Sequence, residues 1–190
     1  NAHPVGTCTW QEAVNEIRTQ KYKTLIDQAR SIPSQDAYDK FKKTRLPAFS
    51  FCADLAYRNK ESVLNATGFI IPDLDHLPDL EGLFKWLMQD PYIWFAFRSP
   101  GGDGIKCALR AEGIYCDDDI KRFFAAMQAY FWQTYQVKVD KSCKDICRLT
   151  HISSDPDIYI NPDPQLFDIE QWMPAEDPPP DPPPQQTQDI

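Results

Sequence analysis

The order of apolar runs between residues 68 and 139 constrains the fold more than any other feature of this sequence. Short runs rich in β-branched and aromatic residues predict strands at 68–74, 92–98, 104–110 and 137–139. Between these runs, apolar residues at helical spacing predict helices at 79–89 and 117–135. The chain is therefore expected to alternate as strand, helix, strand, strand, helix and strand.

This order is that of the split βαβ, or ferredoxin-like, arrangement and indicates an α+β domain. Upstream, the capping-box pattern Thr9-x-x-Glu12 predicts the start of a helix that runs to about Arg30. A second helix is predicted at 34–44 and a strand at 48–52, and a further strand is expected at 149–153. We therefore expect N-terminal helices followed by a βαββαβ sheet.

Negative charge is concentrated at the C-terminal end of the chain. The net charge is -8, yet residues 163–190 contain seven acidic side chains and no Lys or Arg, which leaves -1 for residues 1–162. The charge balance thus neither supports nor excludes a polyanionic partner. Seven prolines among the eleven residues 174–184 predict an extended, solvated linker.

A length of 190 residues accommodates one domain with a sizeable core. We divide the chain into a flexible arm at 1–8, a folded domain at 9–167 and an acidic, proline-rich tail at 168–190. The first two residues, Asn1 and Ala2, are consistent with an expression scar.

The six cysteines favour reduced thiols over a disulfide framework. Cys52 and Cys107 stand inside apolar runs, as small core residues do, and the three histidines are too scattered for a zinc site. We therefore predict a cytoplasmic protein; the alternative is a secreted binding protein held together by three disulfides. No run approaches the roughly 18 apolar residues of a membrane span, so no membrane partner is expected.

The first candidate motif is the stretch GFIIPDLDH at residues 68–76. In a strand, residues i and i+2 point to the same side, so Asp73 and Asp75 are expected to lie together. Two adjacent carboxylates repel each other unless a cation neutralises them, and Mg²⁺ and Mn²⁺ prefer such oxygen ligands. The alternative is that a strand ends here and Asp75 begins a loop that caps the next helix.

The second candidate motif joins two predicted strands through the turn Arg98-Ser-Pro-Gly-Gly-Asp-Gly-Ile-Lys106. Glycines such as Gly102 and Gly104 let the backbone approach a ligand, while the Ser99 hydroxyl and the cations Arg98 and Lys106 would suit a triphosphate. The alternative is an ordinary β-hairpin loop whose glycines supply positive φ angles.

The third candidate motif follows the last predicted strand. Asp140 would complete a carboxylate triad with Asp73 and Asp75, and Arg148 would face a phosphate or pair with Asp145. The alternative is that Asp140 and Asp145 are turn and cap residues.

Together, the three motifs resemble those of the archaeo-eukaryotic primase superfamily, the primase-polymerases. The stretches LPAFSF, GFIIPDLDHL, DPYIWFAFRSPGGDGIK and VDKSCKDICRLTHISSDPDIYIN are more closely similar to the VirE-type amino-terminal domain of Bacteroidetes mobile-element and phage proteins. The resemblance extends over about 10–167, so that the domain at 9–167 is identified as primase-polymerase-like. It implies an RNA-recognition-motif-like catalytic sheet, bound Mg²⁺ or Mn²⁺, nucleoside triphosphates or deoxynucleoside triphosphates as substrates, and a nucleic-acid template.

Carried over by position, the resemblance makes Asp73, Asp75 and Asp140 the metal-binding catalytic carboxylates. Ser99 and Lys106 match the second motif, in which active primases usually have His where this chain has Lys106. The expected nucleotide-binding residues are Arg98, Ser99, Gly102, Gly104, Lys106 and Arg148.

The expected function is therefore template-directed nucleotidyl transfer in the DNA replication of a mobile element or phage, with a helicase module linked through the tail. The alternative is a catalytically degenerate primase-fold module that binds nucleic acid or a replication partner.

Overall fold

The computed structural model describes residues 3–75 and 77–174, and it has the α+β composition that the sequence predicts. Asn1, Ala2 and His76 lie outside the described residues, as does the tail from residue 175 onward. The α-helices of the described residues are α1 (Trp10–Arg18), α2 (Lys23–Arg30), α3 (Gln35–Arg45), α4 (Leu80–Leu87), α5 (Asp117–Tyr135) and α6 (Ile169–Trp172).

All strand pairs in the described residues are antiparallel. The strands are β1 (Ala48–Phe49), β2 (Ala53–Leu55), β3 (Val63–Ala66), β4 (Phe69–Ile70), β5 (Asp73–Leu74), β6 (Phe95–Arg98), β7 (Ile105–Arg110), β8 (Thr150–His151) and β9 (Tyr159–Ile160). In the central sheet, β7 lies between β6 on one side and both β4 and β5 on the other, and β9 pairs with the outer edge of β6. Two small ladders, β1 with β8 and β2 with β3, complete the strand pairs.

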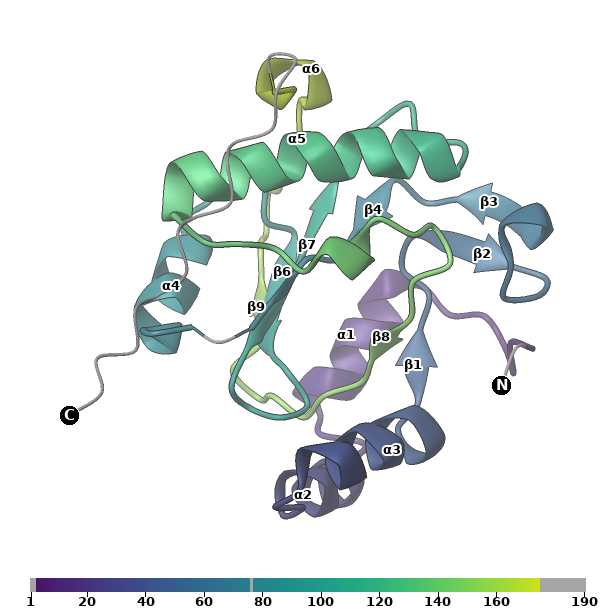
Figure 1. Cartoon of the computed structure of the whole chain (residues 1–190), viewed down its shortest axis with the longest axis vertical. Coiled ribbons are helices and arrows are strands. Elements are labelled where there is room, and N and C mark those ends of the chain that lie inside the picture. The colour runs from purple at the N-terminus through teal and green to yellow at the C-terminus, as the bar shows by residue number, and fades with distance from the viewer. Residues whose placement is uncertain (1–2, 76, 175–190) are drawn as a thin grey trace.

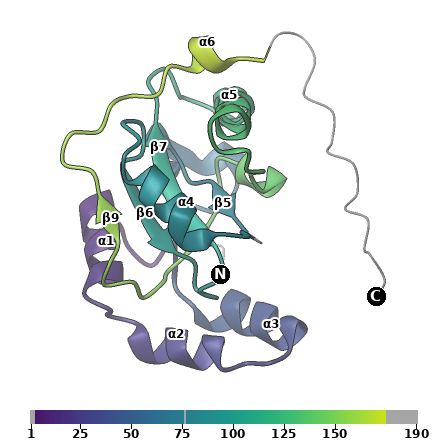
Figure 2. The same ribbon diagram turned by 90° about the vertical axis from the view of Figure 1, so that its left-hand side faces the viewer.

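The central sheet separates two apolar clusters, one on each face. On one face, α4 and α5 cover strand residues that include Leu74 and Ile105. On the other face, α1 packs Val14 against Phe95 and Phe97. Figures 1 and 2 show α1 and α5 on opposite sides of the sheet. Since successive strand residues point to opposite faces, β4, β6, β7 and β9 each contribute to both clusters.

The N-terminal helical region differs from the single helix that its sequence predicts. The capping box at Thr9 and Glu12 is present and starts α1, but this helix ends at Arg18. Gln20 then takes a positive φ of 56°, and the chain starts again as α2. A left-handed residue ends a helix because it redirects the backbone. Because of this interruption, α1 lies on the sheet. The helices α2 and α3 pack against each other as a separate pair at one end of the sheet (Figure 2).

The predicted strand at 68–74 is divided into β4 and β5 by Ile71 and Pro72. Proline has no N–H to donate to a sheet ladder, which explains the interruption. The carbonyl of Pro72 still accepts a bond from the N–H of Cys107 at 3.5 Å, so the segment continues alongside β7. This continuity keeps Asp73 beside the central strand.

The predicted strand at 137–139 is wrong, so the last strand of the βαββαβ order is not formed. The segment reaches the sheet at one point, where the N–H of Asp140 bonds the carbonyl of Asp73 at 3.2 Å. A turn replaces the ladder, because the Asp140 side chain caps the 3₁₀ helix Lys141–Cys143. The predicted strand at 48–52 is also shorter, since β1 ends at Phe49.

The segment assigned to the tail begins within the folded part of the chain. Residues 169–172 form α6, and Ile169 and Trp172 pack against the cluster beneath α5. All six cysteines are unpaired, as the reduced state requires. In the described parts of the chain, no helix has the length and apolar character needed to cross a membrane.

Candidate functional site

The centre of the site is an ion pair between the adjacent strands β5 and β7. Asp73 lies directly opposite Lys106, and its Oδ2 accepts a hydrogen bond from Lys106 Nζ. Lys106 is in turn opposite Phe97, whose ring belongs to the cluster on the α1 face. Laterally paired residues point to the same face, so Asp73 and Lys106 also face the α1 side. Only 14% and 11% of the two side chains are exposed, which shields the ion pair from water.

The third motif joins this pair from the segment that follows α5. Arg148 Nη2 lies 3.2 Å from Asp140 Oδ2 and 3.6 Å from Asp73 Oδ2, so the guanidinium bridges two carboxylates. Burial opposes ionisation of Asp140, but hydrogen bonds from Ser142 and the charge of Arg148 outweigh it and hold the pKa of Asp140 below its usual value. We refer to Asp73, Lys106, Asp140 and Arg148 as the charged cluster. It unites the three sequence motifs.

The glycine-rich loop between β6 and β7 is closed by its own hydrogen bonds. The N–H of Ser99 donates to the carbonyl of Gly104 at 2.8 Å, and the N–H of Gly104 donates to Ser99 Oγ at 3.2 Å. Gly102 takes a φ of +87° and donates to the Ser99 carbonyl at 2.9 Å. A Cβ on Gly104 would lie 2.8 Å from the carbonyl oxygen of Leu74 and 2.7 Å from Asp75 Oδ1. Only glycine therefore allows the loop to lie this close to β5.

Two residues outside the predicted motifs lie against this loop from the N-terminal helices, and one of them, Arg30, bonds to it. Arg30 in α2 donates from Nε to the carbonyl of Pro100 at 3.0 Å and from Nη2 to that of Ser99 at 3.4 Å. A Cβ on Gly101 would lie 3.2 Å from the hydroxyl of Tyr38 in α3. Burial, with the nearby charge of Asp103, raises the pKa of Tyr38 to about 12. Neither residue belongs to a recognisable motif, so no local pattern indicates a role for them.

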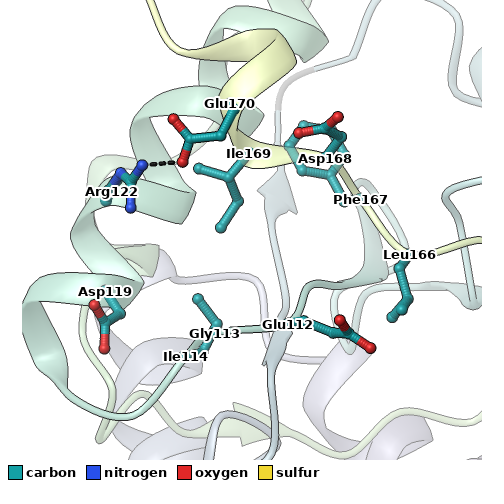
Figure 3. A pocket seen from close by; sticks show the side chains of 10 residues that line it. All are labelled: Glu112, Gly113, Ile114, Asp119, Arg122, Leu166, Phe167, Asp168, Ile169 and Glu170. Carbon is teal, nitrogen blue, oxygen red and sulfur yellow. Dashed lines mark hydrogen bonds and ion pairs between the residues drawn. The ribbon is translucent and has the colours of Figure 1, made fainter.

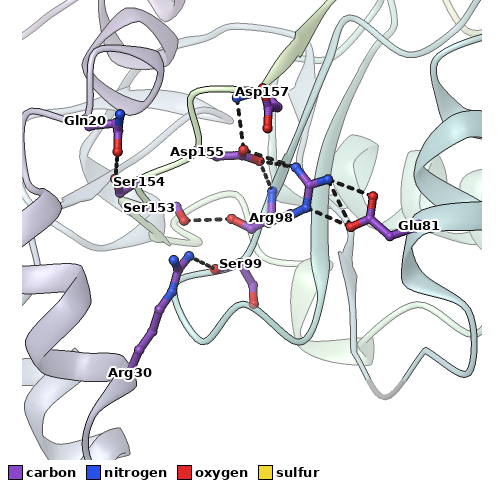
Figure 4. A network of polar contacts seen from close by, with 9 residues as sticks. All are labelled: Gln20, Arg30, Glu81, Arg98, Ser99, Ser153, Ser154, Asp155 and Asp157. Atoms are coloured by element: carbon purple, nitrogen blue, oxygen red, sulfur yellow. Dashed lines mark hydrogen bonds and ion pairs between the residues drawn. The ribbon is translucent and has the colours of Figure 1, made fainter.

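Arg98 does not join the charged cluster, although the sequence predicts it as a nucleotide ligand. Its guanidinium lies 4.8 Å from the ring centroid of Phe84 on α4, and Nη2 lies 2.8 Å from Glu81 Oε2. On its other side, Nη1 lies 3.2 Å from Oδ1 of the buried Asp155. Asp155 also accepts the Arg98 N–H at 2.7 Å, as Figure 4 shows. Arg98 thus connects α4 to the segment before β9.

The three predicted metal ligands are not gathered around one point. Asp73 and Asp140 are linked through Arg148, whereas Asp75 is exposed and lies beside Gly104. Across residues 3–75 and 77–174, no group of three or more His, Cys, Asp or Glu side chains is arranged to hold a metal ion.

One oxygen at the site nevertheless suits a divalent cation. Asp73 Oδ1 is buried and has no hydrogen-bond partner in the described structure. A buried carboxylate oxygen without a partner is costly, and Mg²⁺ and Mn²⁺ prefer oxygen ligands. The free oxygen of Asp73 therefore fits such an ion. The other oxygen, Oδ2, already faces the cations Lys106 and Arg148.

Two surface hollows of the molecule lie away from this site. One of about 390 Å³ is bordered by the N-terminal part of α5, by α6 and by the turn after β7 (Figure 3). A second of about 690 Å³ continues around the same turn towards Gly68 and Arg110. None of the predicted site residues lines either hollow.

The ion pair at the centre of the site should contribute measurably to stability. We expect Lys106→Met to lower the free energy of unfolding by about 2 kcal/mol, because it leaves Asp73 buried with only Arg148 as a partner. Adding Asp73→Asn to Lys106→Met should restore more than half of this loss, since no charge is then left uncompensated. Urea unfolding of the wild type, both single variants and the double variant measures the coupling. Strictly additive losses would contradict the ion pair.

The region that matches a known family is the region that contains the three motifs. The family model described as the BT4734-like N-terminal domain matches residues 41–160. No curated protein and no solved structure matches the chain. The matched region contains the whole charged cluster and the glycine-rich loop, and it leaves out α1 and α2. Because this match extends over more than half of the 190 residues, the chain belongs to the BT4734-like N-terminal domain family, a Bacteroidetes family.

Proposed function

We propose that this chain is a primase-polymerase-like nucleotidyltransferase domain that extends a strand on a nucleic-acid template during replication of a mobile element or phage. The observation that most supports this proposal is the charged cluster. Asp73, Lys106, Asp140 and Arg148 come from three separate parts of the sequence, yet they form one network of ion pairs. Carboxylates and cations held together beside a glycine-rich loop are the groups that phosphoryl transfer requires.

The order of the sheet supports an RNA-recognition-motif-like arrangement. The middle of the chain runs as strand, helix, strand, strand and helix, and β7 lies between β5 and β6. Both α4 and α5 pack on the same face of the sheet. Asp140 lies beside β5, at the edge where a fourth strand of this motif would pair.

In the proposed reaction, the 3′ oxygen of the growing strand bonds to the α-phosphorus of the incoming nucleotide and pyrophosphate leaves. Asp73, whose Oδ1 has no partner among the described residues, would hold Mg²⁺ or Mn²⁺, which when bound neutralises the triphosphate and the leaving group. Lys106 and Arg148 would add positive charge for the phosphate oxygens. Ser99 and Gly104 keep the loop in position through their mutual hydrogen bonds.

A second candidate is a catalytically degenerate module that keeps the fold to bind nucleic acid or a replication partner. The observation that favours it is the ion pair between Lys106 and Asp73. Lys106 stands where the primase pattern usually has His, and its ammonium group already neutralises the Asp73 carboxylate through Oδ2.

Calorimetric titration with Mn²⁺ in the presence of dGTP separates the two candidates. We expect the wild type to bind the nucleotide only when the metal is present, and Asp73→Asn to lose this binding because it removes the negative charge of the buried carboxylate. Asp54→Asn is the matched control, since Asp54 is an exposed residue of β2 outside the site. Metal-dependent binding that survives in Asp73→Asn would overturn the catalytic proposal, and its absence in the wild type would favour the binding module.

A further inference from the structure

Positive charge is unevenly distributed over the folded part of the chain. Residues 40–45 of α3 contain four cations and no carboxylate, in the order Lys40, Phe41, Lys42, Lys43, Thr44 and Arg45. Residues 1–162 carry a net charge of -1, so the remainder of that part carries -5. Such a concentration of cations on one element is typical of a surface that meets a polyanion.

Three of the four cations of α3 lack carboxylate partners, whereas Lys42 Nζ lies 3.2 Å from Asp39 Oδ1. Lys40, Lys43 and Arg45 are exposed, and none has a carboxylate oxygen within ion-pair distance in the described part of the chain. On α5, by contrast, Lys121 pairs with Asp117 and Asp118, and Arg122 pairs with Glu170. Unpaired cations are the ones that can exchange their counterions for phosphates.

A second group of cations lies on the other side of the charged cluster. Lys141 and Lys144 are exposed in the segment between Asp140 and Arg148, and neither side chain has an ion-pair partner among residues 3–75 and 77–174. Arg148 itself is about one-quarter exposed. These residues extend the positive surface away from the site along the 140–148 segment.

The antiparallel ladder between β1 and β8 connects these two groups and places them towards its opposite ends. The chain leaves α3 and enters β1, and Ala48 in β1 lies opposite His151 in β8, three residues after Arg148 (Figure 1). His151 is largely buried, and burial together with the charges of Lys42, Lys106 and Arg148 lowers its pKa to about 4. One imidazole is thus close to cations from α3, from the charged cluster and from the 140–148 segment.

We propose that a basic track, formed by Lys40, Lys42, Lys43 and Arg45 of α3 together with Lys141, Lys144 and Arg148, binds the phosphate backbone of a single-stranded polynucleotide on both sides of Asp73. This inference rests on the proposed function, because it assigns the surface that holds the template strand. Exposed lysines and arginines contact phosphates without reading bases, so the track should bind many sequences equally well. Three of the four α3 cations, Lys42, Lys43 and Arg45, lie within the family match, which begins at residue 41, so most of this part of the track belongs to the matched domain.

Binding of a fluorescein-labelled oligothymidylate, measured by anisotropy over a range of salt concentrations, tests the track. The variant is Lys40→Gln/Lys43→Gln/Arg45→Gln. The control is Arg18→Gln/Lys21→Gln/Lys23→Gln, which removes three exposed cations at the α1 and α2 junction and changes the net charge equally. If each α3 cation contacts one phosphate, the slope of log K against log salt should fall in magnitude by about 2 in the variant. The control should keep the wild-type slope.

Three outcomes would overturn the track: no binding of the oligonucleotide by the wild type, equal weakening in the control, or an unchanged slope in the variant. Thermal unfolding of both triple variants shows whether α3 is still folded. Mn²⁺-dependent binding of dGTP, measured on the same samples, should be unaffected by the α3 changes. If the wild type binds the oligonucleotide but not dGTP, and the α3 variant loses oligonucleotide binding, the track is retained and the nucleotidyltransferase is rejected.

Discussion

Replacing Arg98 with methionine is expected to lower the free energy of unfolding by about 3–5 kcal/mol, the range typical of breaking a buried ion pair. Asp155 is only 3% exposed, and the Arg98 guanidinium is the cation that neutralises it. The Arg98 side chain also covers the Phe84 ring, so the variant loses packing between β6 and α4 as well. Equilibrium unfolding in urea measures the loss.

Glu81→Gln is the matched control for this prediction. It removes the other carboxylate bound to Arg98, but the Glu81 side chain is 62% exposed. Exposed ion pairs contribute about 1 kcal/mol or less, so the control should be nearly as stable as the wild type. If Arg98→Met were as stable as Glu81→Gln and instead failed to bind dGTP, Arg98 would be a nucleotide ligand and not a structural residue.

The second large effect is expected at Phe95, where alanine should cost about 3–5 kcal/mol of unfolding free energy. Phe95 is fully buried in β6, and its ring centroid lies 5.7 Å from that of Trp10 and 5.4 Å from that of Phe51. Both neighbours come from N-terminal segments that cover the α1 face of the sheet. The substitution would leave a cavity between these segments and the sheet, which lowers stability beyond the loss of buried area.

Leu64→Ala serves as the control for Phe95→Ala. Leu64 lies in β3 and is 71% exposed, so its truncation should change the unfolding free energy by no more than about 0.5 kcal/mol. Urea unfolding followed by tryptophan fluorescence compares the two variants with the wild type. Equal stability of the two variants would mean that α1 does not pack on Phe95 as described.

Long segments with one strong signal were predictable from the sequence. The helix predicted at 34–44 corresponds to α3, which begins after Ser34, whose side chain caps it. The helix predicted at 117–135 corresponds to α5. Both have continuous helical spacing with a clear start. The break after Arg18 was not predictable in this way, because the left-handed residue that causes it is Gln20 and not glycine.

Short strands were harder to predict because tertiary contacts decide them. The β2 and β3 ladder contains a register shift near Leu55, and β9 has only two residues, Tyr159 and Ile160, whose pairing depends on β6. None of these three strands has enough alternation of apolar and polar residues to be recognised from its own sequence. At 137–139 the opposite occurred: the β-branched residues of Val-Lys-Val predicted a strand, but the cap at Asp140 turned the chain away from the sheet.

The assembly of the candidate site followed partly from the sequence. Alternation within strands, together with the hairpin, places Asp73 and Lys106 on neighbouring strands, and the register puts them directly opposite each other. The same alternation separates Arg98 from them, because Arg98 follows Phe97 and so faces α4. The contacts of Arg30 with the loop depend on the pairing of α2 with α3, which no local pattern encodes.

Incorporation of labelled deoxynucleotides on a primed single-stranded template, with Mn²⁺ present, tests the central claim most directly. The chain should extend the primer, Asp54→Asn should do so at the wild-type rate, and Asp73→Asn should give no product when assayed well below its own unfolding temperature. Chelation of the metal with EDTA should stop the wild-type reaction. Product formation by Asp73→Asn, or none by the wild type, would contradict the assignment of the charged cluster as a nucleotidyltransferase site.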